Sequence, residues 1–429
     1  MAIGSEDLSL AAAAARDASD PLADLVDRFV VDDPNLIYLD GNSLGRLPRA
    51  TVERLSEVVQ QDWGDGLIRS WDHWIDLPAQ VGDRLGAALL GAGPGQVLVA
   101  DSVTVNLYKL AMAALDRATA ADPARRVVVT DDDNFPTDRY VLAAVAARHG
   151  GELRMVPSDP VHGPDPDRLA AALGPDVALV SLSHVAYRSA AMVDMAAVTE
   201  AVHRAGALTL WDLSHAAGSV VVDLDGTGAD LAVGCTYKYL NAGPGAPAYL
   251  YVRRSLAEGL RSPIPGWFAA ADQFAMGPAF TPLDGVGRFA AGTPSILGVT
   301  AVDEGVRLLA EAGIEQVRDK GVALTTLLID LADARLAPLG FTVASPRDPD
   351  RRGAHVSLTH PEARQISAAL IEDAGVVADF RAPDRLRLGP APLSTRFVDV
   401  VHAVDRIAEL IASGRHQSPT GRPVSPPEA

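Results

Sequence analysis

The chain has 429 residues, of which 48% are hydrophobic, so it is long enough to bury a large core and to form two domains. Its formal net charge of −18 argues against a nucleic-acid groove, because phosphate binding needs a basic face. The single cysteine, Cys235, excludes an internal disulfide and a thiolate zinc site, and no cluster of metal ligands stands out.

Neither end of the chain suggests a membrane protein. Residues 1–20 combine an alanine run with acidic residues and lack a basic stretch, so they are not a signal peptide. No uncharged apolar run is long enough to span a bilayer. Residues 413–429 are rich in Pro, Ser and Gly, which predicts a disordered tail. We therefore expect a soluble, cytoplasmic protein that binds neither nucleic acid nor membrane.

The first predicted elements present two candidate contact regions. Apolar spacing predicts an amphipathic helix within 21–35, followed by a short strand and a glycine-bracketed turn that presents Ser43. Three tryptophans, Trp71 among them, lie within 63–74. They can pack a connector or form an aromatic wall for a ring-bearing ligand, and the residues alone favour packing.

Strands and helices alternate from about residue 96 to residue 255. The predicted strands are 96–100, 126–130, 177–182, 207–211 and 230–233. This order predicts an α/β fold with a mostly parallel, doubly wound sheet. Ligands bind such sheets at the carboxyl ends of the strands, so the residues that follow the strands are candidates for a site.

Polar and aromatic residues occupy these positions. The helix after the first strand starts with Val103 and Thr104, whose N–H groups and hydroxyl can face an anion or only cap the helix. Phe135, held extended by the proline after it, and Asp138 follow the second strand. Asp138 is a helix cap or a ligand contact. Asp212 ends the fourth strand, where it can pair with a cation or a protonated ring nitrogen.

Lysine occurs at only three positions. Lys238 lies between two tyrosines on a predicted turn, and Gly-Pro-Gly follows that turn in the sequence. Arginine supplies the remaining basic residues but cannot lose its proton, whereas a desolvated lysine can act as an amine nucleophile. A buried or snorkelling side chain is the ordinary outcome for a lysine. The candidate site residues that precede Lys238 in the chain favour the nucleophilic role over an ordinary buried side chain.

After residue 261 a long loop precedes a helix that begins near Thr293, and long loops in compact domains are usually functional. Short strands and helices then predict a small C-terminal α/β domain. In this domain Arg387 alternates with leucines, and its side chain forms either a surface ion pair or a contact with a ligand. We expect the chain to divide into an N-terminal segment (1–50), a large domain (51–290), a small domain joined by that segment (291–412) and the tail (413–429).

The order of these features is that of a pyridoxal phosphate enzyme. This cofactor needs an anchor for its phosphate, a stacking face, a carboxylate at its pyridine nitrogen and an amine for covalent attachment. The helix start, Phe135, Asp212 and Lys238 could supply them in turn. An amino-acid substrate also needs a cation for its carboxylate, and Arg387 could provide it.

Longer motifs resemble those of one family, and they lie at Tyr38-Leu-Asp-Gly-Asn-Ser-Leu-Gly45, Trp63-Gly-Asp-Gly-Leu-Ile-Arg-Ser-Trp71, Asn134-Phe-Pro-Thr-Asp138, Trp211-Asp-Leu-Ser-His215, 237–247, 292–294 and 386–388. From about residue 22 to residue 412 the chain resembles the kynureninases. The motifs at 134–138 and 237–247 are the most specific. The resemblance implies PLP fold-type I, the aspartate aminotransferase-like architecture.

The resemblance also implies roles for individual residues. Lys238 would bind pyridoxal 5'-phosphate covalently and move protons, with Tyr237 beside it in catalysis. The residues implied in cofactor binding are Val103, Thr104, Phe135, Asp138, Ser183, Asp212, His215, Tyr237, Lys238, Trp267 and Thr293. Thr293 would come from the partner subunit of a homodimer with a shared active site. Arg387 would bind the substrate carboxylate, with Ser43 and Trp71 on the substrate side.

The implied reaction is hydrolysis of kynurenine, or of a substituted kynurenine such as 3-hydroxykynurenine, in tryptophan breakdown. The products are anthranilate, or its analogue, and alanine. The chain departs from the family pattern at four positions, where Asn, Gly, His and Tyr are usual: Ala186, Ala269, Ala270 and Ser394.

These departures leave another 4-oxo amino acid, or β-lyase or decarboxylase chemistry, as alternatives. Cys235 is poorly placed for a cysteine desulfurase, and the intact lysine, aspartate and arginine argue against a non-enzymatic protein.

Overall fold

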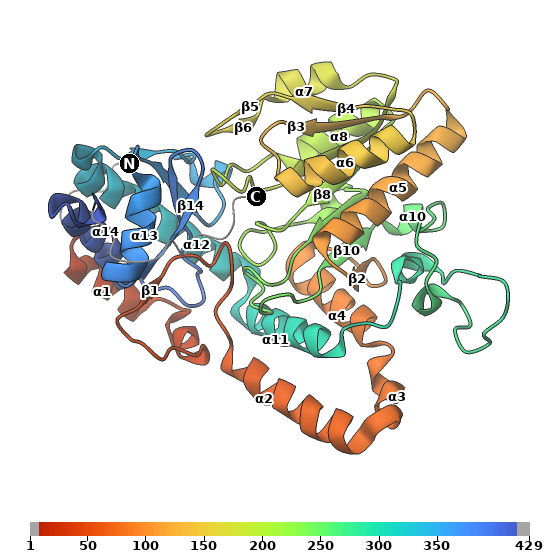
Figure 1. The fold of residues 1–429 in the computed structure, drawn as a ribbon, viewed down its shortest axis with the longest axis horizontal. Coiled ribbons are helices and arrows are strands. Elements are labelled where there is room, and N and C mark those ends of the chain that lie inside the picture. The colour runs from red at the N-terminus through yellow and green to blue at the C-terminus, as the bar shows by residue number, and fades with distance from the viewer. Residues whose placement is uncertain (1–7, 418–429) are drawn as a thin grey trace.

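The computed structural model describes residues 8–417 and is built around a seven-stranded sheet of order β2-β10-β9-β8-β7-β3-β4 (Figure 1). The strands are β2 (Val97–Val99), β3 (Val127–Asp131), β4 (Leu153–Val156), β7 (Val177–Ser183), β8 (Leu208–Asp212), β9 (Leu231–Gly234) and β10 (Tyr249–Val252). β4, β3, β7, β8 and β9 run parallel, whereas β10 is antiparallel to both of its neighbours. The mostly parallel sheet predicted from the sequence is confirmed.

Helices cover both faces of this sheet, because its strands are apolar on both sides. The helices of this part are α2 (Arg49–Glu57), α3 (Trp71–Trp74), α4 (Leu77–Leu85), α5 (Val103–Ala121), α6 (Pro136–Arg148), α7 (Pro166–Ala172), α8 (Met195–Arg204), α9 (Leu224–Thr227), α10 (Arg254–Ala257) and α11 (Ile296–Ala312). One apolar cluster takes in α5 and α6, and another takes in α4, α8 and α11. The predicted boundary at 290/291 stays a prediction, and α11, which follows it, packs with the large sheet.

A four-stranded antiparallel sheet forms the smaller part, at the left of Figure 1. Its order is β11 (Thr342–Val343), β12 (Val356–Thr359), β15 (Arg385–Leu388) and β14 (Asp379–Arg381). Ser357 pairs with Arg387, and Arg387 pairs with Asp379. Because side chains alternate along a strand, these three share one face, while leucines and valines fill a separate core on the other face. This sheet is therefore polar on one side and apolar on the other.

The N-terminal segment completes the smaller part. The helices of the smaller part are α1 (Leu10–Ser19), α12 (Ile314–Leu331), α13 (Ala363–Asp373) and α14 (Phe397–Ala412). In the N-terminal segment, β1 (Ile37–Tyr38) pairs in parallel with β13 (Val376–Val377). Asp17 at the end of α1 accepts the N–H of Phe397 at 2.7 Å and so caps α14. Asp20 forms an ion pair with Lys320 at 2.6 Å, with both side chains buried.

Two local predictions are wrong. The amphipathic helix expected within 21–35 is a six-residue 3-10 helix, Ala23–Arg28, because the segment is held at Asp20 by Lys320 and turns at once. The disordered tail expected from residue 413 does not include 413–417. There His416 is buried and lies 3.1 Å from Glu362. Residues 418–429 lie outside the described part of the chain.

None of the helices between residues 8 and 417 is both long enough and apolar enough to cross a membrane.

We expect Leu386→Ala to lower the free energy of unfolding by about 2–5 kcal/mol, because Leu386 is fully buried on the apolar face of the small sheet. Urea denaturation would measure the change. Leu10→Ala, on the exposed side of α1, is the matched control and should cost less than about 1 kcal/mol. Equal losses in the two variants would contradict this assignment of the small core.

Candidate active site

A cavity of about 250 Å³ lies at the carboxyl ends of the parallel strands. The predicted residues that line it are Val103, Thr104, Phe135, Asp138, Ser183, Asp212, His215, Tyr237 and Lys238. They follow five different strands, so the topology of the sheet gathers residues that are far apart in the sequence. The cavity is the one place in residues 8–417 where these predicted residues meet.

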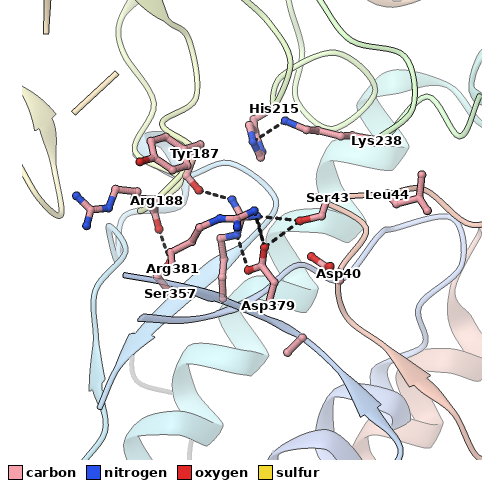
Figure 2. Close-up of polar contacts among 12 residues, drawn as sticks. Asp40, Ser43, Leu44, Tyr187, Arg188, His215, Lys238, Ser357, Asp379 and Arg381 are labelled. Atoms are coloured by element: carbon pink, nitrogen blue, oxygen red, sulfur yellow. Dashed lines mark hydrogen bonds and ion pairs between the residues drawn. The ribbon is translucent and has the colours of Figure 1, made fainter. Parts of the chain in front are cut away.

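Lys238 presents its amine to this cavity. Its Nζ lies 2.9 Å from Nε2 of His215, and both side chains are labelled at the top of Figure 2. Burial, together with the charges of Lys238 and Arg387, holds the pKa of His215 well below its usual value. A neutral imidazole can accept a hydrogen bond from the lysine ammonium and orient it. The Nδ1 of His215 is buried and has no hydrogen-bond partner among the described residues.

Two carboxyl groups meet at the other side of the cavity. Asp138, at the start of α6, is almost fully buried and lies next to Asp212 at the end of β8. Burial and the adjacent charge of Asp212 raise the pKa of Asp138 well above its usual value. This shift favours the protonated form of Asp138, which can donate a hydrogen bond to Asp212. Asp212 Oδ1 also accepts the N–H of Ser214 at 2.7 Å, which fixes the carboxylate.

The start of α5 offers an anion site. Ser102 caps the helix by accepting the N–H of Val105 at 3.4 Å, which leaves the N–H groups of Val103 and Thr104 and the Thr104 hydroxyl at the cavity. Phe135 stands opposite, with its ring edge-on to Tyr187 at 5.3 Å between centroids. The site thus has a helix start for an anion and an aromatic face for a ring.

Arg387 is only 1% exposed and donates four hydrogen bonds. Its Nε and Nη2 donate to the two carboxylate oxygens of Asp379 at 2.9 and 2.5 Å. Its Nη2 also donates to Ser43 Oγ at 2.9 Å, and its Nη1 donates to the carbonyl of Tyr187 at 2.6 Å. In Figure 2, Ser43, Asp379 and Arg381 lie below Lys238 and His215.

Sequence reasoning missed Asp379, Arg381, Asp40 and His355. Arg381 Nη2 lies 2.8 Å from Asp379 Oδ2, and Asp379 lies opposite Arg387 across two strands. The available signal was the alternation of residues in β14 and β15, which places Asp379, Arg381 and Arg387 on one face once the two strands are paired. His355 is fully buried, with its ring centroid 5.5 Å from that of His215.

Five predicted residues do not line the Lys238 cavity of their own chain: Ser43 and Arg387, which are bonded to each other, and Trp71, Trp267 and Thr293. Thr293 is exposed and lines a separate cavity of about 390 Å³ together with Phe268. Trp267 is 41% exposed and stacks edge-on with Phe268 at 4.5 Å. Trp71 lies 5.8 Å from Phe268 between ring centroids. Trp71, Trp267 and Phe268 thus form an aromatic group outside the lining of the Lys238 cavity.

The four departures from the family pattern lie outside the lining of the Lys238 cavity. Ala269 is fully buried and accepts the N–H of Leu283, and Ala270 bridges to Pro282 across the same loop. Ala186 lies in the loop that leads to Tyr187, and Ser394 lies in a turn before α14, with its N–H bonded to Ala391.

Comparison with known proteins identifies relatives over most of the chain. Residues 317–407 match the model of the kynureninase C-terminal domain. A kynureninase of Pseudomonas fluorescens is 43% identical over 401 residues, which cover 92% of this chain and 94% of that protein. A kynureninase of Burkholderia pseudomallei (strain 1106a) is 42% identical over 411 residues, which cover 95% of this chain and 96% of that protein.

Solved structures share the fold at lower identity. The cysteine desulfurase of Thermococcus onnurineus NA1 has a TM-score of 0.75 at 17% identity, covering 88% of this chain and 95% of that chain. A variant of C-DES with glycine covalently linked to its PLP cofactor has a TM-score of 0.78 at 20% identity, covering 88% and 97%. At these identities the likeness establishes the fold alone.

We expect Asp40→Asn to change how stability depends on pH. Burial and the neighbouring Asp379 raise the pKa of Asp40 to about 6. The stability that the protonated carboxyl contributes is fully present below its unfolded pKa of about 4 and is lost as the pH rises through about 6. Between pH 4 and pH 7, the free energy of unfolding of Asp40→Asn should rise relative to wild type by about 1–3 kcal/mol.

Urea denaturation at both pH values would test this, with Asp65→Asn, on an exposed carboxylate, as the control. The same difference from wild type at both pH values would show that Asp40 does not titrate in this range.

Proposed function

The chain belongs to the kynureninase family, and on that premise we propose that it hydrolyses the Cβ–Cγ bond of L-kynurenine, or of a ring-substituted kynurenine such as 3-hydroxykynurenine. One water is consumed, and the products are anthranilate, or its hydroxy analogue, and L-alanine. The observation that carries the proposal is the position of the Lys238 amine, which faces a cavity between the start of α5 and the carboxyl groups of Asp138 and Asp212. The extended identity to kynureninases supports the same reading.

The lining of the cavity fits pyridoxal 5'-phosphate. The fit is supported by the chemistry of the lining: N–H groups at the start of α5 for an anion, the half-exposed ring of Phe135 for a stacking face and the amine of Lys238 for covalent attachment. Val103 and Thr104 would hold the phosphate, and Tyr237 would donate to it, because burial raises the pKa of Tyr237 and keeps its phenol protonated. Ser183 is held toward the cavity by its bond to Asn134 at 2.8 Å.

Pyridoxal phosphate, when bound, withdraws electrons from the substrate and so lets the bonds at its Cα and Cβ break. With the cofactor bound, Asp212 would hold a proton at the pyridine nitrogen, and the adjacent Asp138 would keep Asp212 in place. Lys238 Nζ would remove the proton from the substrate Cα and return it, with neutral His215 orienting the amine. Arg387 and Ser43 would bind the substrate's α-carboxylate, and Phe135 would cover the ring face.

We also infer a cytoplasmic homodimer with a shared active site. Trp267 and Thr293 are exposed and lie outside the Lys238 cavity of their own chain, so a second copy could carry them to the phosphate of the first. The loop that contains Trp267 also exposes Phe274 and Met276, at 68% and 73%. Apolar exposure of this size supports an interface between copies. The unpaired Cys235 supports a reducing compartment.

Lys238→Ala should lose the visible absorption of the bound cofactor and at least about a thousandfold in turnover, because no other amine lines the cavity among the described residues. Turnover of kynurenine and of 3-hydroxykynurenine would be followed by fluorescence of the aryl product and by mass detection of alanine. Lys238→Arg keeps the charge but not the nucleophile and should be equally inactive. Wild-type protein that releases neither product would overturn the proposed function.

Thr293→Ala should weaken cofactor binding about five- to tenfold if Thr293 reaches a partner's phosphate through one charge-assisted hydrogen bond. Equilibrium dialysis of the cofactor against the dimer would measure this. Ser295→Ala, two positions away and also exposed, should bind as wild type does. Unchanged affinity in Thr293→Ala would remove Thr293 from the phosphate site.

A further inference from the structure

The arginine expected to bind the substrate carboxylate already holds a carboxylate of its own chain. A guanidinium has two edges that can grip a carboxylate with parallel N–H groups. The Nε–Nη2 edge of Arg387 is taken by both oxygens of Asp379. The Nη1–Nη2 edge is taken by the Tyr187 carbonyl and Ser43 Oγ. With 1% exposure, Arg387 cannot accept a second carboxylate in this geometry unless a present partner leaves.

Asp379 has a second cation at hand. Arg381, two residues along β14, approaches the same Oδ2 atom at 2.8 Å. Arg381 is less buried than Arg387, and its charge is felt by His215 and Tyr237 at the main cavity. One aspartate thus bridges a buried guanidinium and a more exposed one.

Two arginines share one carboxylate here. Arg387 and Arg381 supply two positive charges, and Asp379 supplies one negative charge; burial would raise the pKa of Asp379, but both arginines hold it below its usual value. A further acidic group beside them is Asp40, whose pKa burial and Asp379 raise to about 6. While Asp40 is protonated, the cluster carries one uncompensated positive charge, which a monoanionic ligand would balance.

We propose that Asp379 is a latch: it occupies Arg387 in the substrate-free enzyme and passes to Arg381 when the substrate's α-carboxylate takes its place on Arg387. The inference rests on the proposed function in that the substrate is an α-amino acid. Arg381 is in this scheme a positioning residue, which makes the exchange possible by keeping Asp379 paired. Ser43, bonded to both Asp379 and Arg387, can follow either carboxylate because its hydroxyl both donates and accepts.

A double-mutant cycle on the holoenzyme tests the latch. Arg381→Gln leaves Asp379 and the substrate to compete for one guanidinium, so KM for kynurenine should rise at least about tenfold while kcat stays within about threefold. Asp379→Asn removes the competitor, so its KM should be no higher than that of wild type. In Arg381→Gln combined with Asp379→Asn the charge available to the substrate is restored, and KM should return to within about threefold of wild type.

Rescue by the second substitution separates a latch from a structural ion pair. If Arg381 and Asp379 only stabilise the fold, the double variant should be no better than Arg381→Gln, and that result would overturn the proposal, as would an unchanged KM in Arg381→Gln. Arg347→Gln removes an equal charge from an exposed pair with Asp333 and should leave KM unchanged. Thermal unfolding of each variant would identify any that fails to fold.

A second readout keeps this test independent of turnover. L-alanine has the amine and carboxylate of the substrate without its aryl group, and L-alaninamide lacks the charge. The upward shift of the unfolding temperature by L-alanine should follow the same order across the four proteins, and the amide should not discriminate between them. If wild type does not turn over kynurenine but L-alanine follows this order, the proposed function fails and the latch stands. If wild type turns over kynurenine but the shift by L-alanine does not follow this order, the latch alone is overturned.

Discussion

A full positive charge buried at Arg387 is the constraint on which the site depends. Taking a guanidinium out of water costs several kcal/mol unless its N–H groups and its charge are met by fixed partners. Asp379, Ser43 and the Tyr187 carbonyl meet them here, and each comes from a different part of the chain. The same contacts bring the N-terminal segment, the small sheet and a loop of the large sheet together. Compensation of one charge therefore also fixes how the parts of the fold lie around the cavity.

The two-faced small sheet explains how such a charge can be built into a stable part. Strict alternation on β12 and β15 sends leucines and valines into a dry core and sends Ser357 and Arg387 to the opposite side. The apolar face supplies the stability that the polar face lacks. The sheet can thus present a charged surface to the large part without weakening its own core.

The sequence predicts the large sheet and the grouping of the residues that line the Lys238 cavity, because both depend on local signals. Apolar runs that end at or shortly before a distinctive residue, as at Asp138, Asp212 and Lys238, indicate their own position. Asp379 and Arg381 could not be found this way. Their importance comes from cross-strand register with Arg387, a non-local relation that no short motif carries. Trp267 and Thr293 follow from family resemblance, and a single chain does not bring them to Lys238.

The contacts between the small sheet and the large part end mainly on backbone carbonyls. Arg387 donates to the carbonyl of Tyr187, Ser357 to that of Arg188, and Arg385 to that of Pro160. Every residue has a carbonyl, so these three contacts recognise the path of the loop, to which the Arg188 side chain adds one bond to the carbonyl of Ala382. During evolution such a loop is free to exchange side chains, as at Ala186, while its docking is preserved. New substrate preferences could arise there without any change in how the two parts of the enzyme fit together.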